Sequence, residues 1–223
     1  MKLKAALAAG VLALAAITAV PSSAEDTFNA PVATRQADES GTRTAIFAGG
    51  CFWGIEAIFS HTRGVSSVVS GYHGGSAETA RYRAVTQGNT GHAEVVRVTY
   101  DPAVVRYDQL LQILFSVGAD PTQLNRQGPD RGSQYRNAII PMTQEQRAVA
   151  TAYLAQMRRS GVWDSPVVTA IEPYETFYAA EEYHQDYLVK NPDNPYIVRW
   201  DAPKVAALRT MFPRLWRATY RRG

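Results

Sequence analysis

Runs of apolar residues alternate with polar, glycine-rich breaks along most of this chain. Short apolar runs predict strands over residues 43–48, 65–72, 92–100, 135–140 and 167–171. Apolar positions at helical spacing predict helices over 52–59, 108–117, 143–159 and 204–211. Strands and helices alternate without an internal repeat or a second domain, so the pattern predicts an α/β or α+β fold.

The strand predicted over residues 92–100 is apolar on both faces, which is typical of a central strand. Glu94 interrupts one of these faces, in the row shared with His92, Val96 and Val98. A carboxyl group on an apolar face is unusual because burial disfavours its charge. Burial should raise the pKa of Glu94 and make it a proton donor near neutral pH.

Residues 119–133 show no periodicity at all. Long structureless loops inside compact domains are often functional. We therefore expect this segment to contribute to a site.

Cys51 is the only cysteine in the 223 residues, and it stands where a predicted strand gives way to a helix. Gly49 and Gly50 permit a tight turn before it, and Phe52 opens the helical pattern after it. Unpaired N–H groups and the helix dipole favour an anion at this position, which predicts a lowered thiol pKa. A lone cysteine is most often a small buried apolar residue, but the turn and the helix start favour a nucleophile.

The first 24 residues have the features of a secretory signal peptide: a basic start, an apolar run and a small-residue exit. Cleavage is predicted after Ala24. The alternative is an uncleaved membrane anchor, but the apolar run is short for a helix that spans a membrane. The sequence thus predicts an exported protein, periplasmic or secreted, with no stable membrane association after cleavage. Residues 25–41 are expected to be a mobile leader, 42–200 the catalytic domain and 201–223 a helical extension.

The charge balance gives little support for nucleic-acid binding. Loss of Lys2 and Lys4 with the signal peptide lowers the formal net charge from +3 to +1. The arginines near the end of the chain fit a solvated tail better than a binding patch. A single cysteine in an exported protein cannot form an internal disulfide, so it indicates a free reactive thiol or an intermolecular pair.

The stretch Gly50-Cys51-Phe52-Trp53-Gly54 resembles the nucleophile motif of the peptide methionine sulfoxide reductase A family. Segments 71–75, 91–95 and 120–136 also match this family, and 181–188 resembles its Tyr-His-Gln-x-Tyr helix. Ala119 and Asn137 depart from it, since the family usually has His and Ser there. The resemblance covers about residues 44–196 and implies a two-layer α/β sandwich with a mixed sheet.

The resemblance also implies an activity: thiol-dependent reduction of methionine S-sulfoxide, free or in proteins, through a sulfenic acid on Cys51. This would make the chain a protein-repair enzyme after oxidation. Glu94 would be the acid, Tyr82 and Tyr135 would bind the sulfoxide oxygen, and Asp130 would position polar groups. The apolar slot and its surroundings would comprise Phe52, Trp53, His184 and Tyr187.

No bound cofactor is expected, and the oxidised cysteine would be reduced by an external thiol, either a thioredoxin-like protein or a small molecule. A monomer is expected. His92-Ala93-Glu94 is similar to the His-x-Glu of zinc deaminases, but one cysteine and four histidines offer no tetrahedral zinc spacing. We therefore predict no metal.

Two other classes fit a reactive cysteine. A cysteine hydrolase or acyltransferase would pair Cys51 with a base such as His73 or His92 and form a thioester. A thiol redox sensor would need no substrate slot, so it would tolerate loss of Phe52 and Trp53. A sulfenic acid formed by turnover would favour the reductase.

Overall fold

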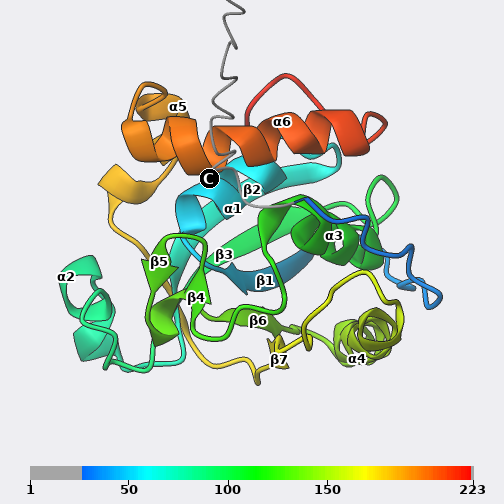
Figure 1. Cartoon of the computed structure of the whole chain (residues 1–223), viewed down its shortest axis with the longest axis horizontal. Helices are drawn as coiled ribbons and strands as arrows, with labels where there is room; N and C mark the ends of the chain where they lie inside the picture. Colours follow the sequence, from blue (N-terminus) through cyan, green and yellow to red (C-terminus); the bar gives the residue numbers. More distant parts are fainter. Residues whose placement is uncertain (1–26, 222–223) are drawn as a thin grey trace, which may run out of the picture.

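A mixed β-sheet forms the centre of the protein in the computed structural model, which describes residues 27–221 (Figure 1). Its six strands lie in the order β7-β6-β1-β3-β2-β8, with β6 and β7 parallel and the other neighbours antiparallel. These strands are β1 (Arg43–Gly49), β2 (Val65–His73), β3 (Ala93–Tyr100), β6 (Asn137–Ile140), β7 (Ala170–Ile171) and β8 (Phe177–Ala179). The helices are α1 (Phe52–Ser60), α2 (Tyr82–Val85), α3 (Tyr107–Ile113), α4 (Gln144–Arg159), α5 (Tyr187–Lys190) and α6 (Ala202–Met211). The predicted α/β fold with a mixed sheet is confirmed.

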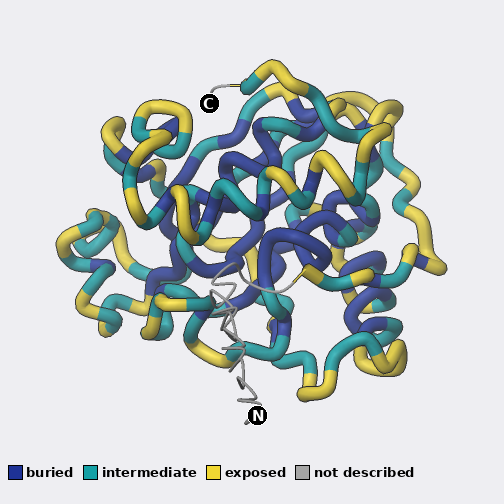
Figure 2. Tube along the Cα trace, turned by 45° about the horizontal axis from the view of Figure 1, so that its top comes forward, coloured by how far each residue is buried: buried dark blue, intermediate teal, exposed yellow. Residues whose placement is uncertain are grey.

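The two faces of the sheet bury different clusters. Side chains alternate along a strand, so Phe47 and Val96 join the large core that includes α1, whereas Ile46 and Val95 join a small cluster on the other face. Figure 2 shows the buried chain gathered in the middle of the molecule. Glu94 lies two residues before Val96, so its side chain belongs to the face that α1 covers.

The turn between β1 and α1 follows the sequence prediction. Gly50 has a φ of 87°, and a Cβ atom there would lie 2.4 Å from the Cβ of Gln127. Only glycine fits both the left-handed backbone and the close approach. Cys51 then occupies the N-cap position of α1.

The segment predicted to be structureless contains a small hairpin of β4 (Arg126–Gln127) and β5 (Asp130–Arg131). Tyr135, predicted to begin a strand, instead ends a 3₁₀ turn over Ser133–Tyr135, and β6 starts two residues later. Strands β4 and β5 have two residues each, which is too short to give a periodic pattern, so the sequence did not reveal them.

The helix expected over 181–188 is wrong in one respect. A 3₁₀ turn over Glu182–His184 and the short helix α5 are separated by Gln185 and Asp186. Asp186 has φ 56° and ψ 29°, a left-handed conformation that no right-handed helix can pass through. The break redirects the chain between His184 and Tyr187. The strand predicted over 167–171 is likewise reduced to β7, and β8 was not predicted.

The segment predicted to be a mobile leader, residues 25–41, makes contacts with the rest of the chain where the structure describes it. The Phe28 N–H donates to the carbonyl of Ser116 at 2.9 Å, and the Ala37 N–H donates to Asp108 Oδ1 at 2.9 Å. Arg35 forms an ion pair with Glu145 at 2.8 Å. This segment therefore lies against α3, α4 and the chain after α3. The predicted signal peptide, residues 1–24, lies outside the described residues.

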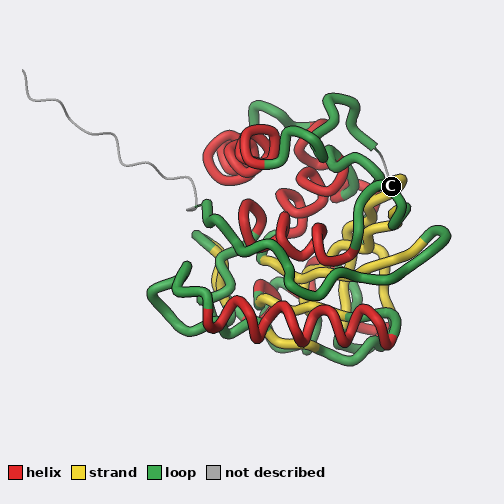
Figure 3. The backbone as a smooth tube through the Cα atoms, turned by 90° about the vertical axis from the view of Figure 1, so that its right-hand side faces the viewer, coloured by secondary structure: helices red, strands yellow, loops and turns green. Residues whose placement is uncertain are grey.

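The C-terminal segment is part of the same domain. Helix α6 packs on α1, and its Leu208 is fully buried (Figure 1). A bridge joins Thr62 to Trp216, so the chain after α6 returns to the end of α1. Figure 3 shows the marked C-terminus close to the body of the domain. Residues 201–221, predicted to be a helical extension, thus pack against the sheet-bearing part of the chain. No helix among residues 27–221 has the length and apolar character needed to cross a membrane.

Candidate active site

A cavity of about 300 Å³ opens at the start of α1. Its lining comes from α1, α2, β3, the β4–β5 hairpin, the turn before β6 and the link before α6. The lining residues are Cys51, Phe52, Trp53, Tyr82, Glu94, Asp130, Tyr135, Asn194 and Tyr196. All of these except Asn194 and Tyr196 are residues that the sequence singled out. The structure thus brings the nucleophile, the acid and the two tyrosines of the prediction to one place.

The Cys51 thiol does not have the lowered pKa that its position suggested. Withdrawal of the sulfur from water raises its pKa above the ordinary value, and the charge of Glu94 raises it further. The carboxylates of Asp201 and Asp130 act in the same direction, whereas the backbone N–H of Trp53 favours the thiolate. Burial and the nearby charges therefore outweigh the effect of the helix N-terminus on the pKa, and Cys51 is a thiol in the resting protein.

Glu94 is almost completely buried, and its Oε2 accepts a hydrogen bond from the backbone N–H of Phe52 at 3.1 Å. Burial raises the pKa of Glu94 to about 8, although that hydrogen bond opposes the shift. At neutral pH the group is mainly a neutral carboxylic acid. This agrees with the expectation drawn from its row of apolar neighbours, and it provides a proton donor inside the cavity.

Two phenol groups enter the cavity from different elements. Burial, with the negative charge of Glu94 as the next cause, raises the pKa of Tyr82 to about 12 and raises that of Tyr135 as well. Both hydroxyls therefore stay protonated and can donate hydrogen bonds to an oxygen. Asp130 accepts a hydrogen bond from the Tyr196 hydroxyl across the cavity.

An aromatic wall closes one side of the cavity. The Tyr187 ring stacks on Trp53 with 3.8 Å between centroids and 7° between planes, and the Trp53 Nε1–H donates to His184 Nδ1 at 3.1 Å. The His184 ring also packs against Phe52, with centroids 5.1 Å apart. His184 and Tyr187 are absent from the cavity lining, so they brace Trp53 from behind instead of facing a ligand.

Asn194 and Tyr196 were missed because they lie in a link rich in proline and asparagine that has no periodic pattern. Tyr196 stands edge-on to Trp53, with centroids 5.8 Å apart and planes at 84°. Asp201, which follows, is also buried, and a Cβ atom on Gly54 would lie 2.3 Å from its Oδ1. The second glycine of the motif is thus required by the packing of this link against α1.

The histidines proposed as bases for a hydrolase are engaged elsewhere. His73 Nε2 accepts the N–H of Glu175 at 3.0 Å, and His92 Nε2 lies 3.0 Å from the carbonyl of Ser76. Neither residue lines the cavity. The cysteine hydrolase interpretation therefore lacks its base. Among residues 27–221, no group of three or more histidine, cysteine or acidic side chains could hold a metal ion.

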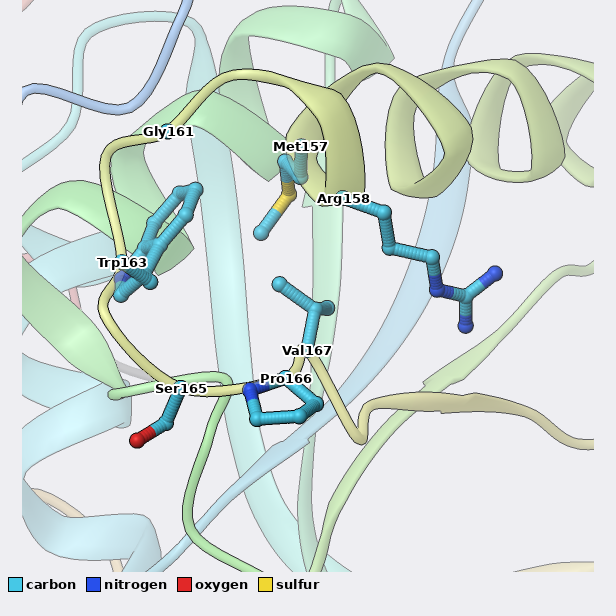
Figure 4. Close-up of a pocket in the computed structure, with 7 residues that line it drawn as sticks. All are labelled: Met157, Arg158, Gly161, Trp163, Ser165, Pro166 and Val167. Carbon is cyan, nitrogen blue, oxygen red and sulfur yellow. The ribbon is translucent and has the colours of Figure 1, made fainter.

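A larger cavity, of about 440 Å³, lies beside the end of α4. Its lining comprises Met157, Arg158, Gly161, Trp163, Ser165, Pro166 and Val167. Figure 4 shows Met157 and Val167 facing one another, with the Arg158 guanidinium directed away from them. It contains neither a thiol nor a carboxyl group, so the chemistry belongs to the smaller cavity at Cys51.

Comparison with known proteins agrees with this geometry. The peptide methionine sulfoxide reductase family model matches residues 43–214. A peptide methionine sulfoxide reductase MsrA 2 of Mesorhizobium japonicum is 53% identical over 176 residues, covering 79% of this chain and 90% of that protein. One of Synechocystis sp. is 50% identical over 172 residues, covering 77% of this chain and 80% of that protein.

Solved structures give the same result. Mxr1 from Saccharomyces cerevisiae in reduced form has a TM-score of 0.63 at 33% identity, covering 72% of this chain and 92% of that one. Methionine sulfoxide reductase A of Corynebacterium diphtheriae has a TM-score of 0.58 at 33% identity, and the match covers 76% of this chain and 89% of that one. The family match reaches past the sheet and through α6, which agrees with the packing of that helix on α1. The chain therefore belongs to the peptide methionine sulfoxide reductase family.

Proposed function

We propose that Cys51 is the nucleophile with which this chain carries out the reaction of its family, the reduction of methionine S-sulfoxide to methionine. One observation carries the proposal. A single cavity holds the thiol, a buried neutral carboxyl group, two phenols and an apolar wall. A redox sensor would need only the thiol, whereas a sulfoxide reductase needs all four.

The sulfoxide binds with its S-methyl group against Phe52 and Trp53, because these side chains supply the apolar surface of the cavity. Its oxygen then lies among the polar groups, where the hydroxyls of Tyr82 and Tyr135 donate hydrogen bonds. Donors fixed in advance stabilise the negative charge that grows on the oxygen as the sulfur is attacked. The same donors withdraw electrons from the sulfoxide sulfur and make it more electrophilic.

The Cys51 sulfur then attacks the sulfoxide sulfur while Glu94 gives its proton to the oxygen. The thiol proton of Cys51 replaces the one that Glu94 has given, so the carboxyl group is regenerated. The oxygen moves to Cys51 as the bond between the two sulfurs breaks. One thiol and one sulfoxide give one sulfenic acid and one thioether: the substrate sulfur is reduced by two electrons, and Cys51 is oxidised by two.

Asp130 and Tyr196 act together in this arrangement. Because the Tyr196 hydroxyl donates to Asp130, the carboxylate is held at the cavity wall. We expect this pair to orient the polar side of the cavity without taking part in proton transfer.

The sulfenic acid is cleared by a thiol from outside the chain, since the 223 residues contain no second cysteine. A first thiol forms a mixed disulfide with Cys51 and releases water, and a second thiol displaces Cys51 as a free thiol. A thioredoxin-like protein or a small thiol would both satisfy this chemistry. Free methionine sulfoxide and oxidised proteins are the proposed substrates, and the protein acts as a monomer.

We further propose that the protein is exported. The support is the sequence of residues 1–24, which has the charge, apolar run and small-residue exit of a signal peptide. Mass spectrometry of the protein recovered from fractionated cells tests this, because a chain beginning at Glu25 outside the cytoplasm is expected. Recovery of the whole chain from the cytoplasm alone would contradict export.

The activity is tested by turnover with each sulfoxide epimer separately, with and without an added dithiol. We expect the S epimer to be reduced in the presence of the thiol and the R epimer to be left unchanged. Equal reduction of both epimers, or a thioester in place of a sulfenic acid, would show that the assignment is wrong.

A further inference from the structure

One acidic residue is fully buried beneath the active site without lining its cavity. Glu56 stands on α1, five residues after Cys51, with none of its surface exposed. A charged carboxyl group in such a place costs free energy unless it is paired or neutral. The mechanism above does not use this residue, so its burial requires another explanation.

The partner of Glu56 lies in the break between the 3₁₀ turn and α5. Its Oε2 accepts the backbone N–H of Asp186 at 3.0 Å. Asp186 is the residue with the left-handed backbone, a conformation that residues with a side chain rarely adopt. The hydrogen bond to α1 therefore stabilises an unfavourable turn at this point of the chain.

The residues on both sides of Asp186 are anchored as well. His184 accepts the indole N–H of Trp53, and Tyr187 stacks on the Trp53 ring. Between them, the Gln185 side chain exchanges hydrogen bonds with the backbone of Ser70 in β2, at 2.9 and 3.0 Å. The side chains that support Trp53 thus come from one short segment, His184–Tyr187, which we call the brace. Glu56 is the residue of α1 that forms a hydrogen bond with the backbone of this segment.

Glu56 can hold the turn at low cost because it is neutral. Burial raises the pKa of Glu56 to about 8; the charge of Asp186 adds to the shift, while the Asp186 N–H, Ser70 and Lys190 oppose it. Among the described residues, neither Glu56 Oε1 nor Asp186 Oδ1 has a hydrogen-bond partner. A protonated Glu56 thus avoids a second negative charge next to Asp186 and still accepts the Asp186 N–H.

We infer that Glu56 is a positioning residue for the reaction: by holding Asp186 in its left-handed turn, it keeps His184 and Tyr187 against Trp53 and so fixes the apolar wall that receives the substrate. This inference deepens the proposed function and rests on it. Glu56 is not among the residues that line the cavity, so its effect must appear in substrate binding through Trp53.

The test compares two replacements of Glu56. Glu56→Leu fills much of the same volume but leaves the Asp186 N–H without an acceptor, whereas Glu56→Gln keeps an acceptor oxygen and stays neutral. Glu56→Leu should raise KM for the sulfoxide about tenfold, the scale expected when a buried hydrogen bond is lost. Its kcat should change much less, because the wall contributes to binding in ground and transition states alike. Glu56→Gln should restore a KM close to that of the parent protein.

Two further variants separate positioning from general destabilisation. Gln146 is another fully buried polar residue that bonds to the Thr44 carbonyl at 3.0 Å, far along the chain from the brace. Gln146→Ala should lower the unfolding temperature and leave KM unchanged. In a Tyr187→Ala background, Glu56→Leu should have little further effect on KM, because the two residues act through the same wall.

Should Glu56→Leu fail to fold, Asp186→Ala loosens the same turn without altering α1, and it should raise KM similarly. The inference is overturned by an unchanged KM in the folded Glu56→Leu or Asp186→Ala protein, by a Glu56→Gln variant as impaired as Glu56→Leu, or by full additivity with Tyr187→Ala. Absence of sulfoxide reduction by the parent protein would instead overturn the proposed function, so the two failures are distinguishable.

Discussion

The sulfur of Cys51 is subject to opposing influences. The Trp53 N–H at the start of α1 favours the thiolate, while burial and the carboxylates of Glu94, Asp201 and Asp130 favour the thiol. A resting thiol is less open to unwanted oxidation than a thiolate, since reactivity follows thiolate character. Cys51 therefore stays a thiol until a substrate oxygen in the cavity takes up the proton of Glu94.

Replacing Cys51 by serine tests the nucleophile. Cys51→Ser should reduce no sulfoxide above background, because a serine hydroxyl provides almost no alkoxide at neutral pH. The unfolding temperature should stay close to that of the parent protein, since the two side chains have similar shape. Reduction by the folded serine variant, measured as methionine formed per enzyme, would rule out the proposed mechanism.

Replacing Glu94 by glutamine tests the acid. Glu94→Gln should slow reduction by about 10²-fold or more, the usual scale for losing a positioned proton donor. The pKa of Glu94 is raised to about 8, so the parent rate should fall as pH rises through about 8 and the acid loses its proton. The glutamine variant has no such proton and should lack this fall. A variant with the parent's rate and pH profile would show that Glu94 is only structural.

The sequence identified the residues of the site better than it described their states. Cys51 and Glu94 were both found from local pattern, the first from its turn and the second from an apolar row. The raised pKa of Glu94 followed from that row, because burial of one strand face is a local property. The raised pKa of Cys51 did not follow, because it comes first from burial of the sulfur and then from the charges of Glu94, Asp201 and Asp130, all of which reach Cys51 from distant parts of the chain.

At the scale of elements, the apolar wall joins the first turn of α1 to the chain before α5. The resemblance implied one continuous helix over 181–188, whereas the chain forms a 3₁₀ turn and the short helix α5. The left-handed Asp186 lies between His184 and Tyr187, and both of these residues still contact Trp53. The conformation of Asp186 depends on a contact with Glu56, which is 130 residues distant, so no local pattern could predict it.

Removing the indole tests the wall. Trp53→Ala should raise KM for the sulfoxide roughly tenfold or more, since each 1.4 kcal/mol of lost contact changes binding tenfold. Trp163, which lines the other cavity (Figure 4), offers a matched control: Trp163→Ala should affect stability alone. Steady-state kinetics on both variants give the KM values. If Trp53→Ala lowers the stability but leaves KM unchanged, Trp53 only packs in the core and does not bind the substrate.

For the molecule as a whole, both ends of the described chain complete the domain. Ala30 and Ala33 are buried at one end and Leu208 at the other, although neither segment was expected to belong to the domain. Polar segments without periodicity give no sequence signal of where they pack, because their partners, such as Glu145 and Asp108, lie far along the chain. The sheet and the helix of the nucleophile were predictable because their apolar patterns are local.

The recycling of the enzyme is also a property of the whole chain, since these 223 residues contain one cysteine. An internal disulfide cannot form, so the sulfenic acid on Cys51 persists until an outside thiol arrives. Enzyme given excess sulfoxide and no reductant should therefore make about one methionine per chain and stop, leaving Cys51 with one added oxygen. A thiol added afterwards should convert this species to a mixed disulfide and then restore turnover. Intact mass spectrometry after the single turnover checks both steps, with Cys51→Ser as the control that gains no oxygen. Repeated turnover without thiol, or a covalent dimer through Cys51 as the main product, would contradict this cycle.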